Sequence, residues 1–196
     1  MAAFLSGSAT RTIGAMQTTT TLPLIPGHWA LDTAHASVDF AIRHLGVAKV
    51  RGRFTQFEVE VVVGDTLEDT RVNATIDLAS IDTGNRDRDA HCRAQDMIDV
   101  ANRPTLTFRS TRISGRGADW ALEGDVTIGD VTKAIALAVE LGGVEDFPMG
   151  GPRHAGFEVT GELRRTDFGI APGLPAAVLG DVIKLSMDVE LLEPEA

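Results

Sequence analysis

The feature that most limits the folds open to this chain is a two-residue period of apolar side chains. In residues 71–78 (RVNATIDL) every second residue is apolar, as in a β-strand with one buried face. The same pattern recurs in VDFAIRH (38–44), DWALEGDVTI (119–128), VTKAIALAVEL (131–141), GFEVTGELRR (156–165) and DVIKLSMDVELL (181–192). Together with shorter segments between them, the pattern predicts about eight to ten strands.

The alternation also indicates how these strands pair. Parallel strands are covered on both faces and carry continuous apolar runs, whereas these strands are apolar on one face only. The links SGRGAD (114–119) and IGDVT (128–132) have the composition of hairpin turns. We therefore predict an all-β, antiparallel fold, either a closed barrel or a two-sheet sandwich.

Small residues on the inward face favour a barrel that contains a cavity. Ala74, Gly124 and Gly161 occupy mid-strand positions on that face, and the chain has eight Phe, two Trp and no Tyr. A barrel of about eight strands can hold one small ligand when side chains do not fill it. The alternative is that large residues opposite these positions fill the space, as in a packed sandwich.

The balance of charge excludes some partners. The chain has 28 acidic and 18 basic residues, a net charge of -10. Such a chain repels the phosphates of nucleic acids and does not dock stably on an anionic membrane, so we expect at most transient membrane contact. One cysteine excludes an intramolecular disulfide and fits a reducing compartment. No apolar run approaches the roughly 20 residues that span a membrane.

We divide the chain into three parts. Residues 1–27 are expected to form a flexible arm, 28–192 a single barrel domain and 193–196 a short tail. The arm has no basic segment followed by a continuous apolar one, so we expect a cytoplasmic protein. Met16 is an alternative start of the chain.

A charged stretch, NRDRDAHCRAQD (85–96), interrupts the strand pattern and is expected to contain a short helix within residues 86–98. Asp87 and His91 could share a metal ion, although no second cluster of ligands accompanies them. Cys92 could be a nucleophile with a lowered pKa, or a small buried residue. The arginines could bind an anionic head group. Arg–Asp pairing that holds the helix against the barrel is the interpretation that we favour.

Five fragments carry a resemblance to a known family. They are HWALDTAHASVDFAIRHLGVAKVRGRF (28–54), IDTGNRDRDAH (81–91), PTLTFRST (104–111), LEGDVTIGDVTK (122–133) and RRTDFGI (164–170). In order and spacing they resemble the YceI-like family. The resemblance implies an extended antiparallel, lipocalin-like β-barrel around an apolar cavity for a polyisoprenoid lipid. It also implies a homodimer. From the residues themselves we expect neither a metal nor a cofactor apart from the bound lipid.

Two elements of the family can be carried over residue by residue. The RHLG element corresponds to residues 43–46, and the RDxHL element to Arg88, Asp89, His91 and Cys92. Cysteine replaces the usual leucine at position 92, and Met97 and Ile98 stand where phenylalanine is common. These changes keep the positions apolar and alter the shape of the expected pocket.

We expect the lipid tail to lie among inward-facing apolar residues and the head group near basic ones. The candidates for the tail pocket are Phe40, Ile42, Phe54, Phe57, Ile76, Leu78, Phe108, Leu122, Val126, Leu137 and Val159. The candidates for the head group, a quinone or a (pyro)phosphate, are His44, Arg88 and His91. The alternatives are ordinary core packing for the apolar residues and a structural histidine at position 44.

The resemblance therefore implies a protein that binds a prenyl quinone or prenyl (pyro)phosphate and acts in isoprenoid storage, transport or metabolism. A hydrolase or isomerase that works inside the barrel is the first alternative, but no Ser elbow, His-rich metal triad or inward carboxylate pair supports catalysis. A structural scaffold with a fully packed interior is the second alternative. We expect no enzymatic activity and no catalytic residues.

Overall fold

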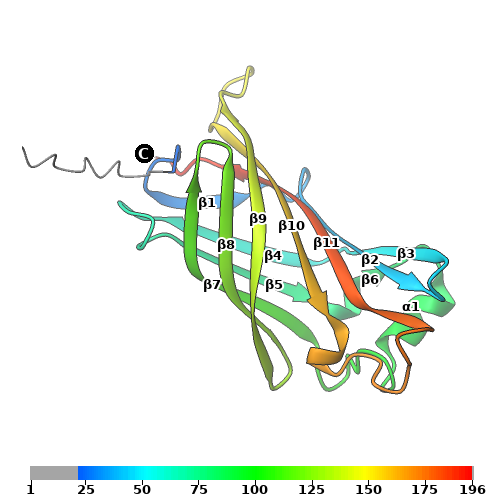
Figure 1. Cartoon of the computed structure of the whole chain (residues 1–196). Coiled ribbons are helices and arrows are strands. Elements are labelled where there is room, and N and C mark those ends of the chain that lie inside the picture. Colours follow the sequence, from blue (N-terminus) through cyan, green and yellow to red (C-terminus); the bar gives the residue numbers. More distant parts are fainter. Residues whose placement is uncertain (1–21, 196) are drawn as a thin grey trace, which may run out of the picture.

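A computed structural model describes residues 22–195 and shows a barrel of long antiparallel strands (Figure 1). The strands are β1 (Gly27–Leu31), β2 (Ser37–His44), β3 (Ala48–Phe54), β4 (Phe57–Val63), β5 (Arg71–Asp77), β6 (Ile81–Asp82), β7 (Thr105–Arg116), β8 (Asp119–Ile128), β9 (Val131–Glu145), β10 (His154–Arg164) and β11 (Leu179–Leu192). One α-helix, α1 (Arg86–Arg93), and two 3₁₀ helices, η1 (Leu78–Ser80) and η2 (Arg165–Phe168), join them.

These strands form a ring with eight positions. Three positions are each shared by two strands that follow one another in the sequence. β1 and β2 share the position beside β11, because both pair with it. β3 and β4 share the next position, since they pair with β2 and β1, and β5 and β6 share the third, since they pair with β4 and β3. Strands β7 to β11 fill the other five positions in order, and the β1–β11 pairing closes the ring. The predicted antiparallel barrel is confirmed, and the sandwich alternative is wrong.

Two predicted turns are hairpins, and the strands beside them are long. β7 pairs with β8 and β8 with β9, across turns in which Gly117 and Gly129 have positive φ angles of 62° and 61°. β9 has 15 residues and β11 has 14, so each extends over about 45–50 Å. Two strands of this length give the barrel its elongated shape (Figure 1).

A compact apolar cluster closes one end of the barrel. Trp29 and Ala155 are fully buried there, together with Leu24, Val61, Val63 and Leu191. The indole nitrogen of Trp29 donates to the Ile25 carbonyl at 3.0 Å. Leu24 lies within the predicted arm, so the last residues of this segment pack on the barrel and the packed part begins before residue 28. Residues 1–21 and Ala196, the rest of the predicted arm and the end of the predicted tail, lie outside the described residues.

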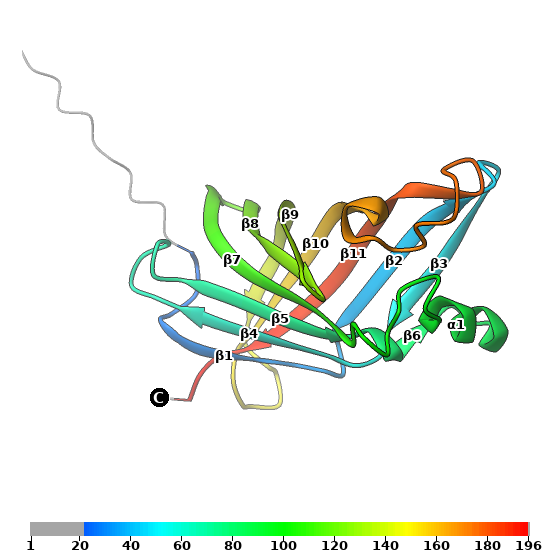
Figure 2. The same ribbon diagram turned by 90° about the horizontal axis from the view of Figure 1, so that it is seen from below.

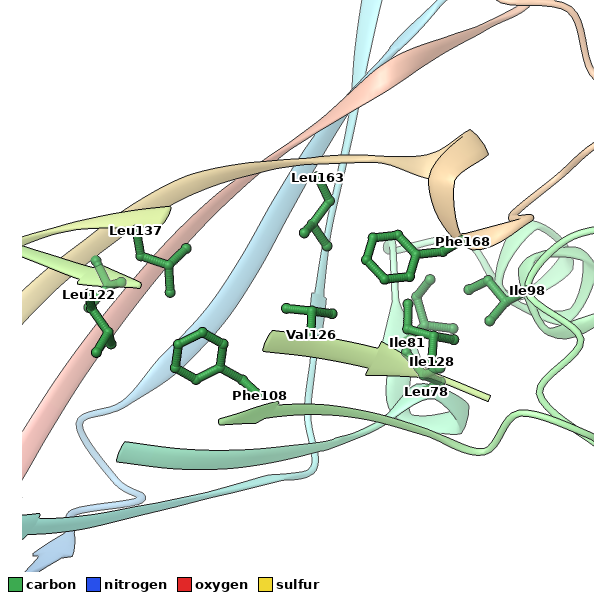
Figure 3. Close-up of a cluster of buried hydrophobic side chains, with 11 residues drawn as sticks. Leu78, Ile81, Ile98, Phe108, Leu122, Val126, Ile128, Leu137, Leu163 and Phe168 are labelled. Atoms are coloured by element: carbon green, nitrogen blue, oxygen red, sulfur yellow. The ribbon is translucent and has the colours of Figure 1, made fainter. Parts of the chain in front are cut away.

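The opposite end of the barrel is built mainly from the segments that connect strands. It contains the β2–β3 hairpin, α1 and the segment between η2 and β11, and Figure 2 shows α1 and β6 beside β2 and β3 at this end. A second apolar cluster lies between the two ends and includes Phe108, Val126 and Phe168. Figure 3 shows its side chains projecting toward one another from opposite sides of the barrel.

Candidate functional site

The interior of the barrel contains one elongated apolar cavity of about 500 Å³. Its wall comes from strands β2 to β11, with residues from η1, from α1 and from the segment between η2 and β11. Such a volume is typical of a site for a small organic ligand. The ionisable residues among those that line the cavity are Asp39, His44, Arg88, His91 and Cys92, and the Asp39 carboxylate accepts from the Ser37 hydroxyl at 2.6 Å.

The cavity opens at one end of the barrel, which we call the mouth: the β2–β3 hairpin, α1 and the 169–179 segment. His44, Arg88 and His91 line the cavity and are also exposed to solvent, so the cavity reaches the surface beside them. The cluster around Trp29 closes the other end. A ligand with one polar end would therefore place that end at the mouth.

Ten of the eleven residues predicted for the tail pocket lie on the cavity wall, from Phe40 on β2 to Val159 on β10. The rings of Phe40 and Phe54 lie 5.5 Å apart on neighbouring strands. Phe57, the first residue of β4, is half-buried and is not among the residues that line the cavity. Contact of the other ten with a ligand stays a prediction.

The small inward residues do not all make room for a ligand. A Cβ atom at Gly124 would collide with the ring of Phe108, and a Cβ atom at Gly161 would collide with the side chain of Leu137. Large residues thus fill the space at both glycines, as the packing alternative predicted. Only Ala74, of these three, lines the cavity.

The charged stretch forms the predicted helix. The Asn85 side chain caps α1 by accepting from the backbone nitrogen of Arg88 at 3.0 Å. Asp89 is buried and accepts from the backbone nitrogen and the hydroxyl of Thr83, at 2.9 and 2.5 Å. The Arg93 guanidinium donates to the carbonyls of Ala79 and Ile81, at 2.7 and 2.8 Å. These bonds fix α1 against η1 and β6.

The contacts that hold α1 differ from those predicted. Within residues 85–96 the carboxylate contact is between Asp96 and the His91 ring, at 3.4 Å, and Arg88 and Arg93 bond to uncharged oxygens. Arg88 donates to the Thr83 hydroxyl at 2.7 Å and to its carbonyl at 2.8 Å. The helix is pinned, but the Arg–Asp pairing that we favoured is wrong. The carbonyls of Ala79, Ile81 and Thr83 and the hydroxyl of Thr83 accept these bonds instead.

Comparison with known proteins identifies the family. The family model described as YceI-like domain matches residues 29–191, which is nearly the whole barrel. The chain belongs to the YceI-like family. Protein YceI of Escherichia coli O17:K52:H18 is 38% identical over 151 residues, which cover 76% of this chain and 78% of that protein.

Two solved structures have the same fold. The YceI protein of Campylobacter jejuni matches with a TM-score of 0.70 and 29% identity, covering 78% of this chain and 90% of that one. A polyisoprenoid binding domain from Saccharophagus degradans, implicated in plant cell wall breakdown, matches with a TM-score of 0.61 and 15% identity, covering 87% and 100%. At 15% identity the second match shows the fold alone.

Within this YceI-like barrel, the three positions that we expected to depart from the family pattern lie on the cavity wall. Cys92, Met97 and Ile98 all line the cavity near its mouth. Burial raises the pKa of the Cys92 thiol above its ordinary value of 9.0, and the nearby Asp89 carboxylate raises it further. Since the thiolate is the reactive form, this environment contradicts the idea of an activated nucleophile.

Cys92 is therefore expected to react severalfold more slowly with iodoacetamide at pH 8 than N-acetylcysteine does, because less of it is thiolate and its side chain is half-buried. Mass spectrometry of the intact protein over time measures this rate. A ligand in the cavity should slow the reaction further, since the thiol lies on the wall. A rate equal to that of N-acetylcysteine would contradict the buried placement.

Two buried or half-buried arginines near the mouth were missed by the sequence analysis. Arg165 is 1% exposed, and its guanidinium donates to the carbonyls of Ile170, Ala171, Leu174, Leu179 and Gly180, at 2.6–3.3 Å. Arg103 donates to the Phe168 carbonyl at 2.6 Å. Together the two arginines hold residues 169–180 against η2 and against the segment that precedes β7. The signal for Arg165 was present, since the inward positions 157, 159, 161 and 163 continue to 165.

A group of potential metal ligands lies at the closed end, away from Asp87 and His91. The ligand atoms of Asp32, His35 and Glu190 are all within 4.8 Å of one another, and His154 Nδ1 lies 2.5 Å from Glu190. The Asp32–His35 hydrogen bond, 2.8 Å long, raises the pKa of His35 and lowers that of Asp32. Of the residues 22–195, this is the place where a divalent cation would meet several ligands together.

The Asp32–His35 pair gives a pH dependence with a defined sign. Because the folded pKa of His35 is raised, its contribution to stability is complete below 6.5 and disappears as the pH rises through the folded value. Because the pKa of Asp32 is lowered, its contribution is complete above 3.8 and disappears on acidification. We expect NMR titration to place the His35 pKa above 6.5 and Asp32→Asn to lower it toward that value. An unchanged His35 pKa in Asp32→Asn would contradict the pairing.

None of the helices among residues 22–195 has the length and apolar character needed to cross a membrane.

Proposed function

We propose that this YceI-like protein binds a polyisoprenoid lipid, with the tail in the cavity and the head group at the mouth. The observation that carries the proposal is the cavity itself, which is apolar along its length, closed at one end and bordered by His44, Arg88 and His91 at the other. The name of the Saccharophagus degradans neighbour as a polyisoprenoid binding domain supports the same class of ligand.

The energetics fit a carrier or a store. Burial of one five-carbon isoprene unit corresponds to about 4 kcal/mol of transfer free energy from water, at about 0.8 kcal/mol per CH2. A lipid that comes from a bilayer already has apolar surroundings, so its tail gains little by entering the barrel. Selectivity then rests on the fit of the tail and on contacts with the head group, and the lipid can be released again.

The head-group contact is proposed for the basic side of the mouth. Arg88 uses Nε and Nη2 for Thr83, and both groups lie at the cavity wall. The remaining Nη1 is available to an anionic oxygen, and a hydrogen bond to a charged group contributes about 1.5–3 kcal/mol. His44, the last residue of β2, faces the same opening. A prenyl pyrophosphate therefore fits the mouth better than an uncharged prenol.

A binding comparison tests this proposal. Polyprenyl pyrophosphate, polyprenol and a prenyl quinone with equal tails are offered in detergent, and bound lipid is measured by native mass spectrometry. We expect binding of all three and tightest binding of the pyrophosphate. Arg88→Met should weaken the pyrophosphate about tenfold or more and leave the prenol unchanged. Arg86→Met on the same helix is the matched control, since Arg86 does not line the cavity. No uptake of any of the three lipids by the wild type would refute the proposal.

Binding without chemistry is part of the same proposal. The members of the family reported above and the polyisoprenoid-binding neighbour favour a binding protein over a hydrolase or isomerase. The cavity argues against the scaffold alternative, which requires a packed interior. Incubation followed by extraction should return each lipid with unchanged mass, and conversion to a product would favour the enzyme.

We further propose that the protein works in the cytoplasm and as a homodimer. The single cysteine supports a reducing compartment. Cell fractionation tests the location, and light scattering after size exclusion tests the dimer. A periplasmic fraction or a monomer at micromolar concentration would contradict the respective statement.

A further inference from the structure

The tip of the β2–β3 hairpin carries apolar side chains that the fold does not bury. Leu45 is 53% exposed and Val47 is 82% exposed, at one edge of the mouth. The backbone nitrogen of Leu45 donates to the Val178 carbonyl at 2.9 Å, which ties the hairpin to the segment across the mouth. In that segment Pro175, Ala176 and Ala177 are exposed as well. Both sides of the opening therefore present uncharged residues to the outside.

The backbone conformation of the turn does not explain why a leucine stands at position 45. Leu45 and Gly46 have φ angles of 52° and 69°, and the Val47 nitrogen donates to the His44 carbonyl at 3.2 Å. Two central residues with positive φ define a turn in which Asn-Gly is preferred, and a bulky apolar residue is unfavourable there. Leucine at this position neither suits the backbone nor adds to the core. An apolar contact outside the chain would give it a role.

The outer face of the same hairpin is basic. Arg43, Lys49 and Arg51 are exposed, and residues 40–54 contain four basic and no acidic residues in a chain of net charge -10. Arg43 is paired directly with Lys49 across the strands, an arrangement of like charges that costs stability. Within residues 22–195 these three side chains form no ion pair, whereas Arg53 pairs with Asp82 at 3.3 Å. The hairpin thus has a local charge opposite to that of the whole chain.

We propose that the β2–β3 hairpin docks on an anionic lipid bilayer, with Leu45 and Val47 inserted between the head groups and Arg43, Lys49 and Arg51 against the phosphates. This contact would place the mouth of the cavity at the membrane, and it rests on the proposed function for its purpose, the exchange of a lipid. Basic residues close to an anionic membrane are attracted to it, whereas the acidic remainder of the molecule is repelled by the membrane. The contact is therefore oriented and reversible.

Vesicle binding tests the docking surface without any prenyl lipid. The full chain is sedimented with vesicles of phosphatidylcholine and phosphatidylglycerol at 7:3, and with pure phosphatidylcholine as reference, in low salt. We expect binding only to the anionic vesicles. Leu45→Asn with Val47→Ser should lower the partition coefficient about tenfold or more, and Lys49→Gln with Arg51→Gln about thirtyfold. Leu45→Asn suits the turn, so thermal unfolding should show a fold at least as stable as the wild type.

The matched control is an apolar residue at the opposite end of the barrel. Met149, in the β9–β10 connection, is 84% exposed and close to Glu145 and Asp146, and Met149→Ser should leave vesicle binding unchanged. Equal binding by the hairpin variants and the wild type, or no binding by the wild type, would overturn the proposal. A change of oligomeric state in the hairpin variants with unchanged vesicle binding would overturn it in favour of a surface between two copies.

Measurements of lipid uptake from detergent and from vesicles distinguish a failure of the docking surface from a failure of the proposed function. Hairpin variants should take up a polyprenyl lipid from detergent as the wild type does, and from anionic vesicles more slowly. Uptake from both sources at wild-type rates would refute the docking surface and leave the cavity function intact. A wild type that takes up no lipid from detergent would refute the cavity function, and vesicle sedimentation would still decide the docking surface.

Discussion

Replacement of Arg165 with methionine is expected to lower the free energy of unfolding by about 3–5 kcal/mol. The side chain is 1% exposed, and its guanidinium donates to the carbonyl oxygens of five residues that border the mouth. Methionine fills similar space but leaves several of these buried carbonyls without a donor, and each costs about 1–3 kcal/mol. Urea denaturation followed by circular dichroism measures the loss.

Arg164→Met is the control for this prediction. Arg164 is the preceding residue, its side chain is exposed, and it pairs with Asp181 at 3.0 Å on the surface. Such a pair contributes at most about 1 kcal/mol. Equal effects of the two substitutions would show that Arg165 does not organise the segment between η2 and β11.

Replacement of Ala74 with phenylalanine is expected to abolish uptake of a polyprenyl lipid while the barrel still folds. Ala74 lies on β5 between Val59 and Phe108 on the neighbouring strands, and its side chain faces the cavity. A phenyl ring there would occupy part of the about 500 Å³ that the tail needs. Uptake from detergent is measured by native mass spectrometry, and folding by the thermal unfolding midpoint.

Thr75→Phe is the matched control, because Thr75 is the next residue of β5 and is exposed on the outer face. It should bind lipid as the wild type does. If Ala74→Phe folds and binds lipid with unchanged affinity, the tail does not occupy this part of the barrel. If Thr75→Phe also loses binding, the effect arises from the strand and not from the cavity.

The barrel could be predicted from the sequence because each strand has one solvent-exposed face and one buried face. Alternation in 38–44, 119–128 and 181–192 gave strands that the structure contains, with bounds that agree within a few residues. The shorter segments HWALD (28–32), VRGRF (50–54) and FEVEVVV (57–63) also correspond to separate strands, β1, β3 and β4. Alternation does not reveal that β1 and β2, and likewise β3 and β4, share one position in the ring.

The cavity could be predicted only in part, because its existence depends on which side chains meet across the barrel. Gly124 and Gly161 suggested empty space, but Phe108 and Leu137 fill it. The period of two reveals that a side chain points inward and says nothing about the residue opposite. Ala74 has the same pattern in the sequence and faces the cavity.

Polar contacts were the least predictable part of the site. The sequence showed arginines beside aspartates in 85–96, and opposite charges close together suggested Arg–Asp pairs. In the structure Arg93 instead meets the carbonyls of Ala79 and Ile81, whose availability depends on the short η1 helix. Asp32, His35 and Glu190 come together only when β11 returns to β1, so their proximity requires the closed barrel.

The net charge of the chain does not describe how its charges are distributed over the surface. A net charge of -10 predicted that the chain would avoid anionic membranes. The β2–β3 hairpin carries the opposite sign over residues 40–54, and it stands at the mouth of the cavity. Composition describes the average surface, while the fold decides which charges are gathered at one place.

We propose that the barrel holds a polyisoprenoid lipid. The most direct measurement is native mass spectrometry of the purified full-length protein, followed by organic extraction and analysis of the released lipid. We predict a co-purifying prenyl quinone or prenyl (pyro)phosphate at close to one molecule per chain, lost in Ala74→Phe. A wild-type protein that carries no lipid, and takes up none when polyprenyl lipids are added, would contradict the claim.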